Sequence, residues 1–200
     1  MKKTKQDAQK TKKEIMKAAL FVFGQKGYTD SSLEMIAKKA GVTRGAIYWH
    51  FENKAALYNA LIKEADIRGD IVIEEAMRSG GTFKDICKRI LIGQWQLLAD
   101  DEEYRAITYL VMFNTGFAPD LEESHKELLK EASVVIRRVE EYVKKGIDAG
   151  QLRRDLKPIE LAHAFLAYQQ GVTVYWLADQ TRFSIKEMAP MLADIFTNGI

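Results

Sequence analysis

Residues 31–54, SSLEMIAKKAGVTRGAIYWHFENK, constrain the fold of this chain more strongly than any other segment. Ser31 precedes Glu34 by three residues, which is the spacing of a capping box, so we expect a helix to begin directly after Ser31. Apolar residues then recur every three or four positions, and Gly41 follows where a left-handed C-cap would end that helix. Thr43 offers an N-cap for a second helix. The segment therefore predicts a helix-turn-helix, in which a glycine turn joins two short helices.

The second of these helices carries hydrogen-bond donors on its outward face. The major groove of DNA admits one α-helix, and the N-terminal residues of such a helix lie nearest the base edges. Arg44 offers a planar guanidinium suited to guanine, and Gly45, which costs a helix roughly 1 kcal/mol relative to alanine, suggests close approach to a sugar-phosphate strand. Tyr48, His50 and Lys54 carry donors suited to phosphates. We therefore expect DNA contacts from Ser31, Ser32, Thr43, Arg44, Gly45, Tyr48, His50 and Lys54.

The charge of the chain is unevenly distributed, although its formal net charge is only +2. Residues 1–54 contain 12 Lys and Arg against 5 Asp and Glu, whereas residues 55–200 contain 18 against 23. This asymmetry predicts a basic binding end joined to a part with another task. Lys2, Lys3 and Lys5 are either simply solvated or follow DNA phosphates as a mobile arm.

The composition predicts an all-α fold. Only 3 prolines occur in 200 residues, and the 47% of hydrophobic residues suffice for one substantial core or two small ones. The sequence has no run of 18 apolar residues and no apolar stretch after the lysine-rich N-terminus, so we expect no membrane span, no signal peptide and a cytoplasmic location. Cys87 is the single cysteine, which excludes an internal disulfide and predicts a buried apolar role.

The apolar periodicity divides the chain into about nine helices. A first helix begins at Asp7 or Thr11, and a long fourth helix begins at Lys54 and connects two halves. We expect a DNA-binding domain over residues 1–53 and a ligand-binding and dimerisation domain over 54–200, with helix 54–78 joining them. After a break at Ser79–Thr82, the expected helices lie near Phe83–Ala99, Glu102–Thr115, Pro119–Ala149, Pro158–Leu177 and Ser184–Asn198.

The string AGVTRGAIYWHFENKAAL, from Ala40 to Leu57, resembles the signature of the TetR family of bacterial transcription regulators. The motif TRGAIYWHF, with TKQDAQ upstream, resembles the sequences of the branch of that family that represses multidrug-efflux genes. The resemblance is dense over residues 4–60 and thin afterwards. It implies nine helices, a double-stranded DNA operator, a small-molecule effector and a homodimer.

The resemblance also implies a ligand pocket in the C-terminal domain, where a ligand would pull on the fourth helix. Large apolar residues after position 83 are mostly core, but polar side chains among them favour a binding site. The expected pocket residues are Ile67, Trp95, Thr108, Met112, Leu166 and Gln169.

The helices near 158–177 and 184–198 are apolar on more than one side, which indicates more than one partner. Pairing them with their copies would form a four-helix bundle and a C₂ dimer.

The most direct interpretation is a ligand-responsive repressor that binds a pseudo-palindromic operator, is released by a small hydrophobic or cationic effector, and controls an efflux-pump gene. Two alternatives are a TetR-like regulator of lipid metabolism or signalling, and a helical ligand-binding module without a DNA function. We do not expect an enzyme, a cofactor or a metal site, because His50, His125 and His163 lack metal-binding spacing and no phosphate-binding glycine loop occurs.

Overall fold

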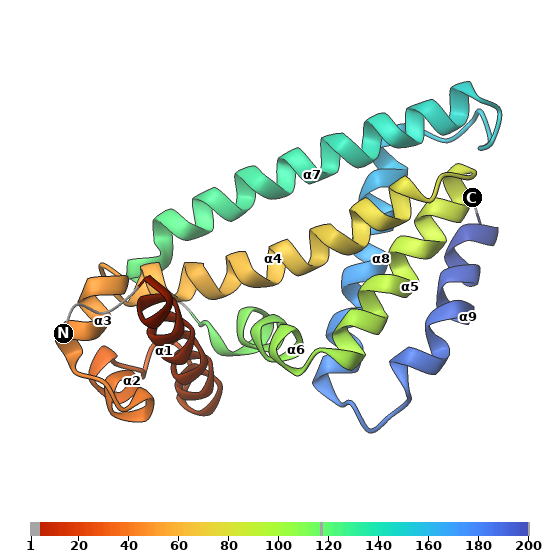
Figure 1. Cartoon of the computed structure of the whole chain (residues 1–200). Helices are drawn as coiled ribbons and strands as arrows, with labels where there is room; N and C mark the ends of the chain where they lie inside the picture. The colour runs from red at the N-terminus through yellow and green to blue at the C-terminus, as the bar shows by residue number, and fades with distance from the viewer. Residues whose placement is uncertain (1–4, 117, 200) are drawn as a thin grey trace. The chain divides into compact units, whose positions relative to one another are not determined.

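The computed structural model describes residues 5–116 and 118–199, and over these residues the chain folds into helices without any strand (Figure 1). The all-α prediction is confirmed. The α-helices are α1 (Lys5–Lys26), α2 (Leu33–Ala40), α3 (Arg44–His50), α4 (Lys54–Arg78), α5 (Phe83–Asp100), α6 (Glu102–Tyr109), α7 (Glu122–Asp148), α8 (Pro158–Ala178) and α9 (Ile185–Asn198). None of these described helices is long and apolar enough to cross a lipid bilayer.

The chain forms two compact units whose limits differ from the expected boundary at residue 53. The first unit contains the chain up to Ile67 together with Glu103–His125, and the second contains Arg68–Glu102 and Lys126–Ile200. Residues 103–125 join the N-terminal helices because Ile107, Leu110 and Leu121 are buried in the same hydrophobic core as α1. Apolar packing therefore groups residues that are distant in the sequence.

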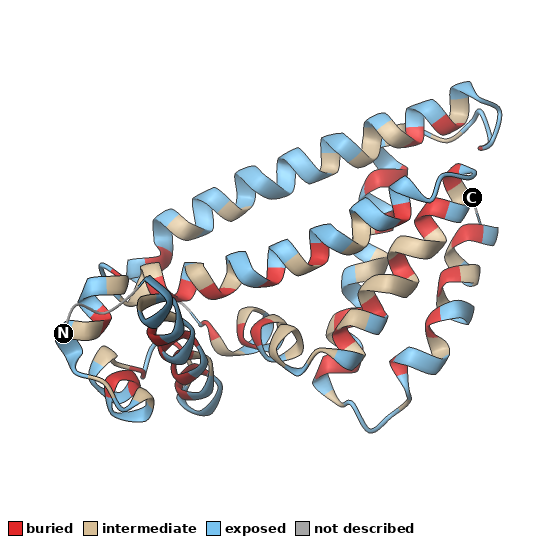
Figure 2. Ribbon diagram, in the orientation of Figure 1, coloured by how far each residue is buried: buried red, intermediate tan, exposed pale blue. Residues whose placement is uncertain are grey.

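The core of the first unit is built from apolar side chains of α1, α2, α3 and α4. The completely buried side chains include Ile15, Phe23, Ile36, Ile47 and Leu57, which come from α1, α2, α3 and α4 (red in Figure 2). Full burial of such a side chain contributes roughly 1.5–3 kcal/mol. This core holds α2 and α3 on α1 although each of the two has at most eight residues, too few to be stable alone.

Local hydrogen bonds define the ends of α2, and they correct one prediction. The N-cap is Ser32, whose hydroxyl accepts from the Met35 N–H at 3.2 Å, so the expected capping box that begins at Ser31 is wrong. Ser31 is buried, and its hydroxyl donates to the Gly27 carbonyl oxygen at 2.6 Å. The expected left-handed C-cap at Gly41 is confirmed, since its φ is 66°.

The expected helix Glu102–Thr115 is only partly α-helical. After α6, the residues Leu110–Asn114 form a π-helical turn, η1. The Thr115 hydroxyl bonds to the carbonyl oxygen of Leu110 at 2.9 Å and to the Tyr58 hydroxyl at 2.7 Å. The Asn114 carbonyl accepts from the Tyr28 N–H at 2.9 Å. These contacts with the first unit's other helices hold the wider turn in place. A 3₁₀ turn, η2 (Pro119–Leu121), then precedes α7.

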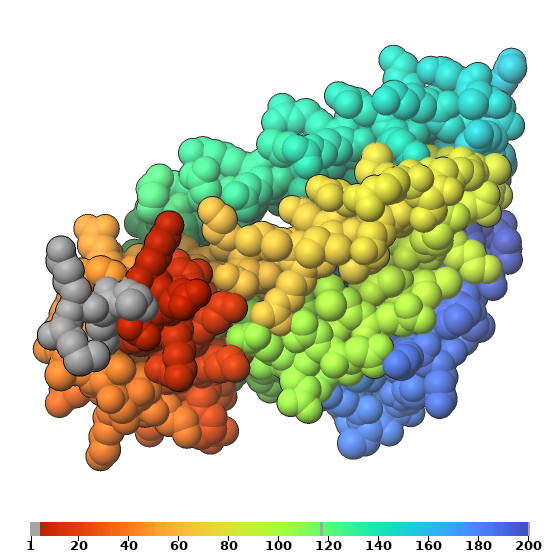
Figure 3. Space-filling model, in the orientation of Figure 1, coloured from red at the N-terminus to blue at the C-terminus, as the bar shows by residue number. Residues whose placement is uncertain are grey.

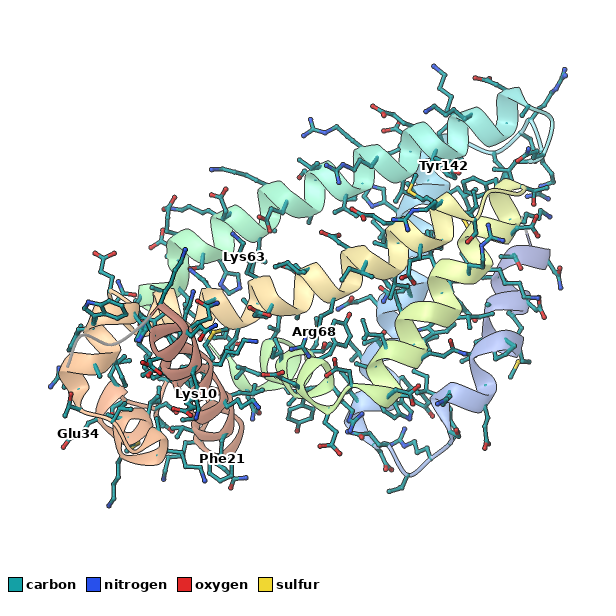
Figure 4. The ribbon with its side chains drawn as sticks, viewed as in Figure 1. Lys10, Phe21, Glu34, Lys63, Arg68 and Tyr142 are labelled. Atoms are coloured by element: carbon teal, nitrogen blue, oxygen red, sulfur yellow. The ribbon has the colours of Figure 1, made fainter. Side chains whose placement is uncertain are left out.

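In the second unit, α9 packs against α5 and also contacts α8. Two ion pairs support the α5–α9 contact: Lys88 bonds to Asp194, and Lys186 bonds to Asp100 at 2.8 Å. At the end of α5, Asp101 accepts from Arg68 at 2.8 Å (Arg68 is labelled in Figure 4). Cys87 is buried on α5, as the sequence predicts.

Candidate nucleic-acid interface

The α2–turn–α3 segment presents α3 with its outer face free. Ile47 is the buried residue of α3, and the Thr43 hydroxyl caps the helix by accepting from the Ala46 N–H at 3.2 Å. Thr43, Arg44 and Gly45 are all exposed at the N-terminal end of α3. The expected helix-turn-helix is thus formed, and the residues expected to read base edges lie together on its surface.

Arg44 and Tyr48 contact each other one helical turn apart. The Arg44 guanidinium donates to the Tyr48 hydroxyl at 2.9 Å and lies 5.4 Å from the centre of the Tyr48 ring. The hydrogen bond with Tyr48 raises the pKa of Arg44 above its ordinary value, so the side chain remains a cation. The pairing holds the guanidinium along the exposed side of α3, where a planar fork of donors suits guanine or a phosphate.

Gly45 has no internal reason to be glycine. A Cβ added there would meet only the Thr43 hydroxyl, at an ordinary 3.8 Å, and the backbone is helical. Packing within the chain therefore does not offset the free energy by which glycine destabilises a helix relative to alanine. Close approach of an external backbone to α3 remains the prediction for this position.

Two of the expected DNA-contacting side chains are used inside the protein. Ser31 faces the interior, so its side chain offers nothing to DNA, whereas Ser32 caps α2 at the surface. The ammonium of Lys54 donates to the carbonyl oxygens of Tyr28, Thr29 and Ser31 at 2.9, 3.5 and 3.1 Å. It also lies 4.1 Å from the centre of the Tyr28 ring. Because an ammonium has three N–H donors, this geometry does not support Lys54 as a phosphate anchor.

The aromatic pair at the end of α3 has mixed exposure. Trp49 is 71% exposed, and its ring stands perpendicular to that of His50 with 4.5 Å between centres. His50 is half-buried next to Phe51, which closes α3 by donating to the Ile47 carbonyl. The sequence suggested no role for Trp49, and its exposure on α3 makes it an additional candidate for contact with DNA.

The exposed face of α1 gathers cations that the sequence prediction did not include. Lys10, Lys13 and Lys17 recur at spacings of three and four, and with Gln6, Gln9 and Glu14 they line a shallow hollow in which the three ammonium groups outnumber the one carboxylate. Space-filling atoms of α1 cover the near face of this part of the chain (Figure 3), and Lys10 is labelled in Figure 4. The spacing of these lysines in the sequence places them on one face of a helix, so this cationic face could have been predicted from the sequence. Positive side chains on one helix face suit a phosphate backbone.

The six expected pocket residues are divided between the two units. Ile67, Thr108 and Met112 belong to the first unit, and Trp95, Leu166 and Gln169 belong to the second.

Within the first unit, Ile67 and Met112 are exposed and the Thr108 hydroxyl donates to the Tyr104 carbonyl at 2.8 Å. Within the second, Trp95 is buried with its ring 6.1 Å from that of Tyr168 on α8. The pocket as a whole remains a prediction.

Titratable groups outside the helix-turn-helix do not form a reactive cluster in the part of the chain that the structure describes. No group of three or more His, Cys, Asp or Glu residues there is placed to hold a metal ion. Burial raises the pKa of the Cys87 thiol to about 12, which makes it a poor nucleophile.

Known proteins match this chain over nearly its whole length. The family model described as bacterial regulatory proteins, tetR family, matches residues 15–61, and that described as MAATS-type transcriptional repressor, C-terminal region, matches residues 83–199. The HTH-type transcriptional regulator AcrR of Shigella flexneri is 32% identical over 192 residues, which cover 94% of this chain and 87% of AcrR.

Solved structures give the same result. NalD, described as the secondary repressor of the MexAB-OprM multidrug efflux pump in Pseudomonas aeruginosa, is 30% identical with a TM-score of 0.83, and the match covers 98% of both chains. A SmeT–triclosan complex shares the fold at 24% identity and a TM-score of 0.79, over 94% of this chain and 90% of the other.

The fold and the exposed α3 define a helix-turn-helix regulator of transcription. The chain belongs to the tetR family of bacterial regulatory proteins, as its N-terminal sequence motif predicts. Its C-terminal part matches the C-terminal region of MAATS-type transcriptional repressors.

Proposed function

We propose that this chain is a homodimeric repressor that binds a pseudo-palindromic operator and controls the gene of an efflux pump. The observation that carries the DNA-binding part is the exposed N-terminal end of α3, where Thr43, Arg44 and Tyr48 lie on a helix fixed by the buried Ile47. Efflux control is supported by the similarity to AcrR and by the 30% identity to NalD. Such a repressor acts on DNA in the cytoplasm.

The dimer part of the proposal rests on apolar side chains left exposed on α8 and α9. Tyr175 on α8 and Met191 and Ile195 on α9 are large, apolar and exposed. Large apolar side chains left exposed on neighbouring helices are typical of a subunit interface. A C₂ dimer would place its two copies of α3 about one DNA turn, roughly 34 Å, apart.

The switching part of the proposal concerns the distance between the two α3 helices. An effector that binds more tightly to a dimer conformation in which this distance does not fit the operator shifts the population toward that conformation. The shift cannot exceed the difference between the binding free energies of the effector for the two conformations. We assign the transmission to α4, because its residues up to Ile67 belong to the first unit and those from Arg68 onward to the second.

Footprinting on the DNA that flanks the gene tests the proposal. A protected pseudo-palindrome is expected, whose protection decreases with salt and is lost with an effector. The panel should contain neutral compounds such as triclosan, a lipophilic cation such as ethidium, and a fatty acyl-CoA. No protection at any salt concentration would favour a helical ligand-binding module, whereas release by the acyl-CoA alone would favour a regulator of lipid metabolism.

A double substitution tests the predicted pocket. Met112→Ala with Gln169→Ala is expected to weaken release of the operator by the active compound while leaving operator affinity intact. Unchanged release would remove these two residues from the pocket.

A further inference from the structure

The end of the π-helical turn η1 is hydrogen-bonded to the connection between α1 and α2. This connection, residues 27–31, leads directly into α2, because Ser32 is the N-cap of that helix. The Asn114 carbonyl accepts from the Tyr28 N–H at 2.9 Å, and the Asn114 side-chain amide donates to the Gly24 carbonyl oxygen at 3.0 Å. Asn114 therefore bonds to the backbone on both sides of the point at which α1 ends.

Gly27 shows how closely these two segments approach each other. Its φ is 77°, in the left-handed region that favours glycine, and a Cβ added there would lie 3.3 Å from the Asn114 carbonyl oxygen. The next residue, Tyr28, also donates from its hydroxyl to the Asp120 carboxylate at 2.6 Å. The chain that follows α6 thus meets the α1–α2 connection through close backbone packing as well as through hydrogen bonds.

Thr115 anchors the turn that carries Asn114. Its side chain is buried, and its hydroxyl bonds to the Leu110 carbonyl oxygen at 2.9 Å and to the Tyr58 hydroxyl of α4 at 2.7 Å. The bond from Thr115 to Leu110 spans five residues, the same spacing that closes a π-helical turn, whereas an α-helical turn closes over four. The wider turn and its buried anchor therefore determine where Asn114 lies.

Lys54, at the start of α4, also holds the connection. Its ammonium donates to the carbonyl oxygens of Tyr28, Thr29 and Ser31. Lys54 thus supplies donors to the carbonyls of this segment, and Asn114 supplies the acceptor for the Tyr28 N–H. The backbone conformation of residues 27–31 consequently depends on two side chains that lie outside it, one in α4 and one in η1.

The conformation of this connection bears on the orientation of α3. The connection leads into α2, and α2 leads into α3 through a tight turn in which the Val42 N–H donates to the Ala37 carbonyl at 3.0 Å. Both helices are too short to be stable alone, so the segments to which they are attached help to orient them. Base recognition requires exact placement of donors, whereas attraction to phosphates does not depend on sequence. A displaced connection should therefore reduce sequence discrimination more than general DNA affinity.

We propose that Asn114 and Thr115, which lie outside the helix-turn-helix, are positioning residues for DNA recognition: they hold the α1–α2 connection in the conformation in which α3 reads base edges. Neither residue contacts DNA in this proposal, because each acts through the backbone of residues 24–31. The inference rests on the proposed function, since it concerns recognition of the operator by α3.

Discrimination between two DNA duplexes tests the proposal. One is the duplex that the natural chain selects from a random library, and the other is a shuffled duplex of equal length and composition. Asn114→Ala and Thr115→Val are each expected to lower the ratio of the two affinities roughly two- to tenfold, the range of one hydrogen bond. The measurement is made where circular dichroism shows each variant to be fully folded, and affinity for the shuffled duplex should change little.

Matched variants separate positioning from stability. Asn59→Ala removes an amide bond of the same kind, to the Ser124 hydroxyl at 2.8 Å, which does not involve the connection, so it should keep the natural ratio. Thr115→Ser retains the hydroxyl and should also keep it. Tyr58→Phe combined with Thr115→Val replaces both hydroxyls of a buried pair, so it should recover stability in urea relative to Thr115→Val alone without recovering the DNA ratio.

Hydrogen exchange of the DNA-free chain provides an independent measurement. Asn114→Ala and Thr115→Val should accelerate exchange of the amides in residues 27–31, including that of Tyr28, because this segment loses part of its support. Asn59→Ala should leave the exchange of the same segment unchanged. Exchange at the natural rate in both Asn114→Ala and Thr115→Val would overturn the inference.

The two proposals fail separately. If the natural chain selects an operator and the Asn114→Ala and Thr115→Val variants keep its ratio, the proposed function stands and this inference is lost. The inference is also lost if Asn59→Ala lowers the ratio as much as they do. If the natural chain selects no duplex from the library, the proposed function itself is lost, and with it the DNA role of both residues.

Discussion

At the scale of single residues, the candidate DNA-binding surface depends on which hydrogen-bond donors are not already used inside the protein. Arg44 is hydrogen-bonded to another exposed residue of α3, Tyr48, whereas Lys54 donates to three backbone carbonyls. The Arg44 guanidinium can exchange its bond to Tyr48 for contacts with a base. The Lys54 ammonium, in contrast, already stabilises the fold of the protein.

Substitution of Arg44 and of Tyr48 should distinguish recognition of a base by Arg44 from orientation of its guanidinium by Tyr48. Arg44→Ala is expected to weaken operator binding roughly ten- to a hundredfold and to relax the base preference, because a bidentate donor is lost. Tyr48→Phe keeps the ring but loses the bond that orients the guanidinium, so a smaller loss on the operator is expected. Fluorescence anisotropy on operator and random DNA measures both. Equal losses of Arg44→Ala on the two DNAs would contradict a reading role.

Substitution of Lys54 should affect stability instead of salt dependence. Lys54→Met removes the donors to the carbonyls of Tyr28 and Ser31 and is expected to lower the free energy of unfolding by roughly 1–3 kcal/mol. Lys63→Met, on the exposed side of the same helix, is the control and should change little. If Lys54→Met left stability intact and lowered the salt slope of DNA binding by about one, Lys54 would be a phosphate anchor after all.

At the scale of helices, the sequence predicted the elements well and their ends less well. Hydrophobic periodicity and the caps Gly41, Thr43 and Ser184 identify their helices because these signals are local. The choice of Ser32 over Ser31 as N-cap depends on the buried bond from Ser31 to Gly27, which only the packed structure supplies.

The π-helical turn at Leu110–Asn114 shows the same limit. It depends on contacts of Thr115 with Tyr58 and of Asn114 with Tyr28, which are distant in the sequence. For the candidate DNA site, the exposed residues of α3 could be predicted, but the internal use of Lys54 could not, since its partners are carbonyls on the connection between α1 and α2.

Burial of Cys87 on α5 predicts a loss of stability in alkali. Its pKa is about 12 in the folded chain against an ordinary 9.0, so above pH 9 the unfolded chain releases a proton that the folded chain retains. Stability should therefore fall as the pH rises from about 9 toward 12. Urea unfolding at pH 7.5, 9 and 10.5 should show a steeper decline for the natural chain than for Cys87→Ala. Parallel declines would mean that the thiol titrates normally in the folded state.

At the scale of the whole molecule, the proposed function requires two copies, because a single α3 would read only half of a pseudo-palindrome. Ile195→Glu places a charge on the apolar surface of α9, where Ile195 is 58% exposed. We expect this variant to sediment as a monomer at micromolar concentration and to lose operator affinity. Val134→Glu, on an exposed part of α7, is the control and should remain dimeric. A dimeric Ile195→Glu variant, or a monomeric natural chain, would contradict the proposed interface.

The inclusion of residues 103–125 in the first unit bears on how regulators of this family can be recombined. A chimera that takes residues 1–53 from one chain and the rest from another would give Tyr28 foreign partners at Asn114 and Asp120, to which it donates hydrogen bonds. The transplantable DNA-reading module is discontinuous and includes a segment that follows α5 in the sequence. Engineered sensors that exchange operator specificity should therefore carry both pieces from the same parent.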